Sequence, residues 1–452
     1  MNANEGGFEL GARGPSAAGA RAVVIGPYLT DRAARENASL RAPQARLDEA
    51  DGLARAIDLD IVGDELVMLN QVRPATYLGK GKVDEIAALI RDAEAELAIM
   101  DCALSPVQQR NLEKAFKAKV IDRTGLILEI FGKRARTREG ALQVELAHLA
   151  YQKSRLVRSW THLERQRGGF GFLGGPGETQ IETDRRLIQE RMSRIEKDLE
   201  QVKRTRGLHR KKRQDAPWPV VALVGYTNAG KSTLFNRLTR ADVMAKDLLF
   251  ATLDPTLRAV KLPHGAQIML SDTVGFISDL PTMLVSAFRA TLEEVIEADV
   301  ILHVRDVSHD DTEAQSADVE TILRELGVEP NDHRRLIEVW NKADLLSAER
   351  RAGLLQASRS KASDERPALV SAVTGEGIDD LLSAIERRVA AGRAVMEVTV
   401  PPEDGAGLAW LYENGEVLHR RNARDGKVIV DIRVGPERVE RLLRRFPDAK
   451  GA

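Results

Sequence analysis

The sequence contains very little cysteine, no long apolar run and almost no excess charge of either sign. Cys102 is the single cysteine among 452 residues, which excludes an internal disulfide and a cysteine metal cluster. A reducing cytoplasm is therefore the compartment that we expect. No apolar run approaches the roughly eighteen residues of a membrane span. The glycine- and alanine-rich residues 1–20 lack a secretion-signal pattern and are predicted to be disordered.

The formal net charge is −1, so total charge indicates nothing about partners and only its distribution is informative. The chain is 43% hydrophobic and 30% charged, as expected of a globular protein with sizeable cores. Its length is sufficient for about three domains. We expect a cytoplasmic monomer without a membrane partner.

A glycine-rich stretch near the middle of the chain separates a predicted strand, 220–224, from a predicted helix that begins at 233. It has the form G-x-x-x-x-G-K-S, which in this context is a phosphate-binding loop. Gly225 and Gly230 let successive N–H groups turn toward phosphate oxygens. Lys231 can reach the β- and γ-phosphates, and the Ser232 hydroxyl can bind Mg²⁺. The predicted nucleotide-binding residues of the loop are Gly225, Tyr226, Thr227, Asn228, Ala229, Gly230, Lys231 and Ser232.

Three further motifs each close a predicted strand, in the order of a GTP-binding domain. In D-x-x-G, Asp272 would hold Mg²⁺ through its water shell and the Gly275 N–H would touch the γ-phosphate. In N-K-x-D, the Asp344 carboxylate could accept the N1–H and 2-amino protons that guanine has and adenine lacks. Ligands bind at the carboxyl ends of parallel strands. In the third motif, 371–373, a backbone N–H would donate to guanine O6. The residues of the three motifs are Asp272, Thr273, Val274, Gly275, Asn341, Lys342, Ala343, Asp344, Ser371, Ala372 and Val373.

The segment 250–256 lies between the phosphate loop and D-x-x-G, where a threonine can bind Mg²⁺ and sense the γ-phosphate. Thr252 and Thr256 both qualify by position. Some GTPases orient the attacking water with a glutamine directly after D-x-x-G, but this chain has Phe276 there. We therefore expect slow hydrolysis without a partner. Asn228 raises the further hypothesis of a potassium ion near the phosphates, because similar GTPases use an asparagine at this position.

Alternating strand and helix patterns predict a small α/β domain over 21–135 and a small α+β domain over 395–448. Within the first, 61–69 is interpreted as a hairpin or strand pair. The run 79–82, Gly-Lys-Gly-Lys, is either part of a second phosphate loop or a tight turn before a capped helix. The predicted fold class is α/β, with a P-loop GTPase domain over 217–390 placed between these two domains.

The segment 136–214 has a different pattern. Apolar residues step by three and four from 142 to 163 and from 188 to 202, which predicts an antiparallel helical hairpin. Its glycine-rich connection, 168–177, contains G-x-G-x-x-G, but a helix precedes it, so we reject a dinucleotide site. Cations outnumber carboxylates about two to one in 133–213, which favours nucleic acid contact over a merely solvated face. Phe170 and Phe172 either stack on RNA bases or fold back onto the protein.

Nearly the whole chain resembles the HflX family of ribosome-associated GTPases. Beyond the GTPase motifs, the resemblance rests on the stretches 77–85, 105–113, 122–124, 134–140, 175–180, 272–277 and 287–294. It implies Mg²⁺-dependent GTP hydrolysis, binding to the large (50S) ribosomal subunit and its RNA, and a role in splitting or rescuing stalled ribosomes. It also implies that the hairpin tip points into the peptidyl-transferase region.

The resemblance also assigns residues by position. The Mg²⁺ threonine would be Thr252, beside Ser232, and the first switch would comprise Phe250, Ala251, Thr252, Leu253 and Asp254. The catalytic set would be Lys231, Thr252 and Gly275, with GTP or GDP, Mg²⁺ and K⁺ as ligands. Arg305 stands where the family pattern runs apolar. Two alternatives stay open: an RNA-binding assembly factor gated by nucleotide with little turnover, and a GTPase acting on a protein or membrane.

Overall fold

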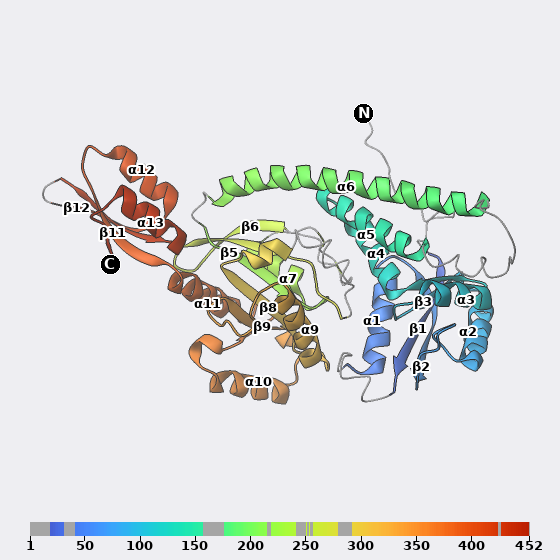
Figure 1. Cartoon of the computed structure of the whole chain (residues 1–452). Helices are drawn as coiled ribbons and strands as arrows, with labels where there is room; N and C mark the ends of the chain where they lie inside the picture. Colours follow the sequence, from blue (N-terminus) through green and yellow to red (C-terminus); the bar gives the residue numbers. More distant parts are fainter. Residues whose placement is uncertain are drawn as a thin grey trace.

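Three β-sheets follow one another along the chain, each with its own helices (Figure 1). The computed structural model describes residues 19–30, 41–156, 176–214, 218–240, 250, 253, 256–278, 292–423 and 426–451. The predicted fold class is confirmed: an α/β GTPase-type domain lies between a smaller α/β domain and a C-terminal domain. Among the helices in these ranges, none combines the length and the apolar character needed to cross a bilayer.

The N-terminal sheet has the strand order β2-β1-β3-β4, with every pair parallel. Its first strand is buried over seven of nine residues, as expected for a strand covered on both faces. Its elements are β1 (Arg21–Leu29), α1 (Pro43–Arg55), β2 (Asp60–Leu69), α2 (Lys80–Asp92), β3 (Leu97–Met100), α3 (Pro106–Phe116), β4 (Lys119–Asp122) and α4 (Arg123–Arg134).

The prediction of a hairpin or strand pair over 61–69 is wrong, because these residues form the single strand β2. The pairing of β1 with β2 shifts register between Ala22 and Val23, whose partners are Ile61 and Gly63. One residue of β2 is thereby left over, which is a bulge rather than a turn. A glycine inside a strand marks either feature, and sequence spacing alone does not separate them.

The run 79–82 forms the start of α2. Gly79 is the N-cap residue in extended conformation, without a side-chain hydrogen bond to the helix. Lys82 pairs with Glu65 at 3.1 Å and with Glu85 at 2.5 Å on the surface. The geometry is that of an ordinary helix start rather than a loop that wraps a phosphate.

The central sheet has the strand order β10-β9-β8-β5-β7-β6, parallel except where β6 runs against β7. Its middle strands are almost wholly buried, and the phosphate loop, D-x-x-G, N-K-x-D and 371–373 follow the carboxyl ends of its parallel strands. Its elements are β5 (Val220–Gly225), α7 (Lys231–Thr239), β6 (Thr256–Lys261), β7 (Gln267–Asp272), β8 (Val300–Asp306), α9 (Thr312–Glu325), β9 (Leu336–Asn341), η2 (Ala343–Leu345), α10 (Ala348–Ser360), η3 (Ser363–Glu365), β10 (Ala368–Leu369) and α11 (Ile378–Ala391).

The C-terminal sheet is antiparallel, with the order β12-β13-β11-β14. Its two helices pack on the sheet around Leu411, Leu442 and Phe446. Its elements are β11 (Ala394–Val400), α12 (Gly405–Asn414), β12 (Glu416–Asn422), β13 (Val428–Val434), α13 (Pro436–Arg445) and β14 (Lys450–Gly451).

Helices α5 (Arg138–Leu156) and α6 (Pro176–Gln214) lie against each other between the first two sheets in the chain. Ile195 and Leu199 of α6 are buried, whereas Leu187 is 54% exposed. On α5 the deeply buried face comprises Val144 and Ala147, which belong to the N-terminal core, while the leucine stripe is only half-buried. The apolar seam is thus present on α6, but α5 is also anchored to the domain below it.

Candidate nucleotide site

The phosphate loop is held tightly between neighbouring strands. Gly225 has φ +152°, and a Cβ there would lie 2.2 Å from the Val304 carbonyl oxygen. Gly230 has φ +90°, and its Cβ would meet the Asn341 side chain at 2.3 Å. Asn228 also adopts a left-handed conformation and is exposed. Only glycine can occupy the first two positions without moving the neighbouring strands, so the loop geometry explains both glycines of the motif.

Lys231 begins α7 and its side chain turns back under the loop. Its ammonium group donates to the carbonyl oxygens of Gly225 at 3.1 Å and Tyr226 at 2.7 Å. Burial lowers the pKa of the Lys231 ammonium to about 8, against the opposing influence of Asp272. A Cβ on Gly275 would lie 3.0 Å from the Lys231 Nζ, so D-x-x-G meets the lysine directly. A buried cation surrounded by neutral acceptors is suited to bind an anion.

Ser232 and Asp272 form a hydrogen bond near Lys231. The Ser232 hydroxyl donates to the Asp272 carboxylate at 2.8 Å, and Asp272 is fully buried. A hydroxyl and a single carboxylate are hard oxygen donors, which suit Mg²⁺ when substrate phosphates complete its coordination. No group of three or more His, Cys, Asp or Glu side chains that could hold a metal occurs in the described part of the chain. The donor set therefore fits a metal that arrives with a nucleotide.

The two base-recognition motifs are connected to each other and to the phosphate loop. The Asn341 amide donates to the Ala229 carbonyl at 2.8 Å, and its oxygen accepts from the Ala372 N–H at 3.0 Å. The Ser371 hydroxyl donates to the Asp344 carboxylate at 2.6 Å. Asp344 itself is exposed. These contacts bring the two motifs together beside the phosphate loop.

Side chains around these motifs reinforce the arrangement. Lys342 pairs with Asp306 at the end of β8, at 2.8 Å. Arg237 of α7 donates to the carbonyl oxygens of Ala372, at 2.9 Å, and Val373. Sequence spacing offers no signal for Arg237, because its partners lie more than 130 residues away.

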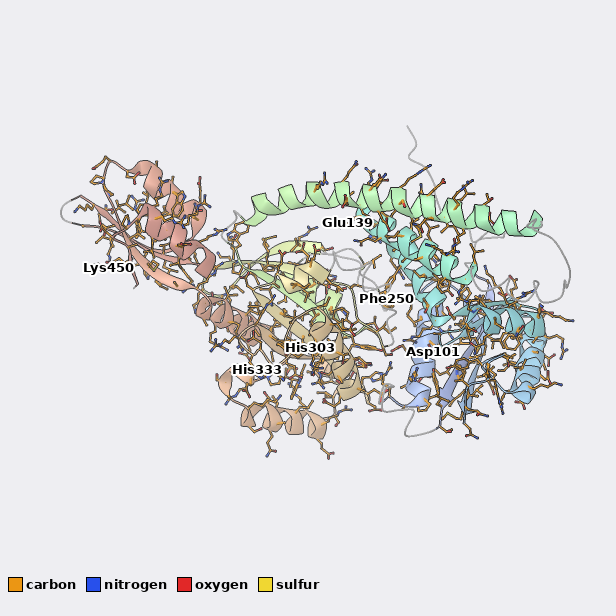
Figure 2. All side chains as sticks on the ribbon, viewed as in Figure 1. Asp101, Glu139, Phe250, His303, His333 and Lys450 are labelled. Carbon is orange, nitrogen blue, oxygen red and sulfur yellow. The ribbon has the colours of Figure 1, made fainter. Side chains whose placement is uncertain are left out.

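The predicted first switch is described only in part. Ala251, Thr252 and Asp254 lie outside the described residues, and the proposed Mg²⁺ threonine is among them. Phe250 and Leu253 are buried in an apolar cluster shared with the N-terminal domain. The Phe250 ring packs edge-on against Phe131 of α4 at 4.7 Å between centroids, at the junction visible in Figure 2. Any nucleotide contact by these two residues would therefore come from their backbone.

A buried network of ion pairs lies where the N-terminal domain meets the phosphate loop. Arg123 pairs with Asp101 and, at 2.7 Å, with Glu49. Arg41 also pairs with Glu49, and the Tyr226 hydroxyl donates to Glu49 at 2.7 Å. Although burial opposes them, the Arg123 and Arg41 guanidiniums hold the pKa of the Glu49 carboxyl below its usual value. The side chains of Arg41, Glu49, Arg123 and Asp101 are all at most 7% exposed.

The same network reaches the segment after D-x-x-G. Arg123 donates to the Ser278 carbonyl at 3.1 Å, and the Ser278 N–H donates to the Tyr226 hydroxyl at 3.0 Å. Phe276 pairs with the loop through the Thr227 N–H, at 2.7 Å, and is 1% exposed. Tyr226 and Ser278 therefore connect both sides of the nucleotide site to the neighbouring domain. Sequence reasoning missed this role; the only signal was the resemblance at 122–124.

The structure accounts for Arg305. Its guanidinium pairs with Glu338 on β9 and with Glu313 at the start of α9, the latter at 2.6 Å. Glu338 also accepts from the Trp340 indole at 2.9 Å. Arg305 thus replaces an apolar contact between neighbouring strands by an ion pair.

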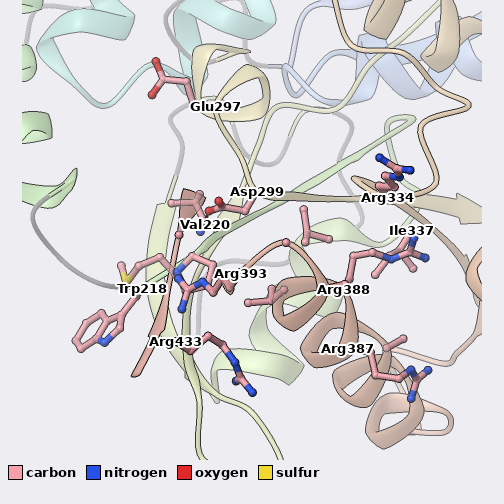
Figure 3. A pocket seen from close by; sticks show the side chains of 18 of the residues that line it. Trp218, Val220, Glu297, Asp299, Arg334, Ile337, Arg387, Arg388, Arg393 and Arg433 are labelled. Atoms are coloured by element: carbon pink, nitrogen blue, oxygen red, sulfur yellow. Dashed lines mark hydrogen bonds between the residues drawn. The ribbon is translucent and has the colours of Figure 1, made fainter. Parts of the chain in front are cut away.

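A separate cavity lies on the opposite side of the central sheet, against the C-terminal domain (Figure 3). Its volume is about 1380 Å³, and it is lined in part by Trp218, Arg387 and Arg433. Several residues at the amino ends of β5 and β8 also line it. It is therefore distinct from the nucleotide site, which lies at the carboxyl ends of these strands.

Four family descriptions match successive parts of the chain. They are GTP-binding GTPase N-terminal over 44–132, GTP-binding GTPase Middle Region over 134–213, 50S ribosome-binding GTPase over 220–342, and HflX C-terminal domain over 356–451. Together they follow the order of the three sheets and the helical hairpin.

Curated relatives extend over most of the chain. A GTPase HflX from Magnetococcus marinus is 53% identical, covering 88% of this chain and 90% of its own length. A GTPase HflX from Escherichia coli is 40% identical, covering 95% and 97%. A solved GTP-binding protein from Sulfolobus solfataricus, in complex with GDP, is 22% identical over 82% of this chain and 99% of its own, with a TM-score of 0.44. On the identity and coverage of the curated relatives, the chain belongs to the GTPase HflX family.

Proposed function

We propose that this cytoplasmic protein is a Mg²⁺-dependent GTPase that binds the large (50S) ribosomal subunit and splits or rescues stalled ribosomes. The observation that carries the proposal is the convergence of Lys231, Ser232, Asp272 and Gly275 beside the N-K-x-D motif. Family membership supports GTP hydrolysis. The match to a 50S ribosome-binding GTPase description supports the ribosomal partner.

In this proposal the phosphate loop binds the β- and γ-phosphates and Lys231 neutralises part of their charge. Phosphate binding should raise the pKa of the Lys231 ammonium, because the phosphates add negative charge to that of Asp272 and so oppose the effect of burial. Ser232, with Thr252, holds Mg²⁺, which would supply charge neutralisation on the phosphates. Gly275 places its N–H at the γ-phosphate, and Asp344 selects guanine.

Substitutions at Asp344 and Lys231 test the roles assigned to these residues. Asp344→Asn should lose GTP and gain xanthine nucleotide, by about 10⁴-fold in discrimination, because a polar group of the bound base would be left unpaired. Lys231→Ala should abolish nucleotide binding while the domain stays folded. Unchanged GTP affinity in either variant would refute its assigned role. Equal turnover in potassium and sodium buffers would remove the K⁺ hypothesis for Asn228.

The helical hairpin supports RNA as the ribosomal target. A groove of about 660 Å³ on α5 and α6 is lined by five cations and one carboxylate, the cations being Lys153, Arg185, Arg186, Arg194 and Lys197. Such a concentration of positive charge fits RNA phosphates, which position a protein on its target. The tip residues Phe170 and Phe172 lie outside the described residues, so their stacking on RNA stays a prediction.

A titration of GTP turnover with purified large subunits tests the proposal. Turnover should be slow alone and rise strongly on subunit addition, because Phe276 is buried and offers no group that orients water. Lys231→Ala is the matched control and should bind no nucleotide. Subunit binding without stimulation would favour the alternative, an assembly factor gated by nucleotide. No subunit binding would contradict both.

A further inference from the structure

The cavity between the central sheet and the C-terminal domain is lined by an unusual number of arginines (Figure 3). Seven arginines and four carboxylates line it, a difference of three positive charges. The arginines are Arg334, Arg366, Arg387, Arg388, Arg393, Arg433 and Arg438, and the carboxylates are Glu294, Glu297, Asp299 and Asp380. Charge of this sign and density is typical of a surface that meets a polyanion.

A carboxylate just outside the lining pairs with two of these arginines. Arg393, at 3.8 Å, and Arg433, at 3.3 Å, both pair with Glu416. The Arg433 Nε is buried, and no hydrogen-bond partner for it occurs among the described residues. Asp299 accepts from the Val220 N–H at 2.7 Å. With Glu416 counted beside the four lining carboxylates, the seven arginines still exceed the carboxylates by two, an excess that a phosphate could neutralise.

A basic stretch of sequence precedes the cavity residue Trp218. Residues 203–213 contain seven lysines or arginines and no carboxylate. Gln214 ends α6, and Trp218, which lines the cavity, follows four residues later. Four residues span at most about 14 Å, so the backbone end of α6 lies within that distance of Trp218.

This region is distant from the hairpin tip. Helix α6 has 39 residues and is therefore about 58 Å long at a rise of about 1.5 Å per residue. The tip joins its first residue, whereas the basic run lies at its last. A hairpin whose tip alone contacts RNA leaves the basic end of α6 without a role.

An aromatic side chain lies at the rim. Trp218 is 42% exposed, and Figure 3 shows its ring at the edge of the cavity, pointing away from the sheet. Exposed aromatic rings next to arginines are the combination that holds unpaired bases, by stacking together with phosphate contacts. The volume of about 1380 Å³ exceeds the upper end of about 1,000 Å³ for small-ligand pockets, so a segment of a polymer fits better than a small ligand.

We propose that this cavity is a second RNA-binding surface that takes a short single-stranded segment, one base stacking on Trp218. The proposal rests on the proposed function, since it makes RNA the target. It adds a contact about one helix length from the hairpin tip.

The test uses the full-length protein and a labelled oligouridylate. Trp218→Ala should weaken its binding about tenfold, because one stacked base is lost. Arg387→Glu, at an exposed position, should also weaken binding. The slope of the logarithm of the binding constant against the logarithm of the salt concentration should become shallower by about 0.7 for each phosphate that the variant no longer binds. Arg444→Glu is the matched control. It makes the same charge change at another exposed position in the C-terminal domain, outside the cavity, and should bind as the parent does.

A second pair of measurements separates this surface from the hairpin. Irradiation of a 5-iodouridine oligonucleotide should cross-link Trp218. Arg185→Glu with Arg194→Glu in the hairpin groove should leave that cross-link intact. If only the hairpin variant weakens binding, the cavity proposal is overturned while the ribosomal role stands. Binding of polyglutamate in preference to RNA would overturn it in favour of an acidic protein partner. If the parent protein binds no RNA, the cavity proposal fails, and the subunit titration separately decides the proposed function.

Discussion

The GTPase domain contacts its two neighbouring domains in opposite ways. The Arg123–Asp101 ion pair of the N-terminal domain lies beside the phosphate loop, and its side chains are 6% and 1% exposed; Arg123 also donates to the Ser278 carbonyl of the GTPase domain. The Arg433–Glu416 ion pair of the C-terminal domain lies at the open cavity, and its side chains are 23% and 27% exposed. The side chains of the first contact are buried beside the nucleotide site, and we call it the sealed contact. Those of the second reach water at the amino ends of the strands, and we call it the open contact.

The difference indicates what each contact can do. Buried charges are stabilised mainly by their ion-pair and hydrogen-bond partners. A movement of Tyr226 or Ser278 on nucleotide exchange would therefore change the energy of the buried ion pairs in the N-terminal domain. Charges near water are cheaply separated and can take new partners. We therefore expect the sealed contact to respond to the nucleotide and the open one to bind an external anion.

The largest expected effect comes from breaking the sealed contact. Arg123→Ala should lower the free energy of unfolding by about 3–5 kcal/mol, because it leaves Asp101 buried without its ion-pair partner and Glu49 paired with Arg41 alone. Urea denaturation measures this. The control is Lys82→Ala, which removes two surface pairs and should cost less than about 1 kcal/mol. Equal losses in the two variants would show that the network is open to water.

A buried histidine provides a reference that belongs to neither contact. Burial lowers the pKa of His303, in β8 (Figure 2), to about 4, against the opposing influence of Glu338. The folded state therefore keeps the ring neutral, while the unfolded chain takes up a proton below its usual pKa of about 6.5. Stability should fall as pH decreases from about 6.5 to 4, by up to roughly 3 kcal/mol from this group.

The measurement for this prediction is the unfolding free energy of the parent and of His303→Leu across that pH range. The parent should lose more stability than the variant as the pH falls, because only the parent has the titrating ring. Parallel curves would contradict a neutral buried ring.

The smallest effect is expected at the open contact. Arg433→Ala leaves Glu416 paired with Arg393 and should cost less than about 1 kcal/mol, because water already reaches the pair. Arg41→Ala makes the matched change in the sealed contact and should cost several times more. A loss at Arg433 as large as that at Arg41 would remove the distinction between the two contacts.

The sequence predicted the fold class and the arrangement of the GTPase motifs because these depend on local spacing. A glycine loop between strand and helix, such as 225–230, is defined within a few residues. The prediction failed at 61–69, where a hairpin or strand pair was expected and the residues form one strand with a bulge next to Gly63. The role of Arg305 could not be predicted from its neighbours in sequence either, because its partners lie on other elements.

The sealed network could not be predicted from spacing. Arg123 contacts Glu49, 74 positions away, and Ser278, 155 positions away. Arg123 meets Glu49 only when the N-terminal domain has folded, and it meets Ser278 only after that domain has docked on the GTPase domain. Each residue alone is an ordinary charged residue of a helix or loop.

We expect nucleotide state to be transmitted through Tyr226 to the domain that carries the hairpin. Large-subunit affinity should therefore be measured with GDP and with a non-hydrolysable GTP analogue, for the parent and for Tyr226→Phe. The affinities of the parent for the large subunit should differ at least about fivefold between the two nucleotides. The difference should be much smaller in the variant, which lacks the hydroxyl that joins Glu49 and Ser278. Equal affinities in the parent, or an undiminished difference in Tyr226→Phe, would rule out transmission through Tyr226.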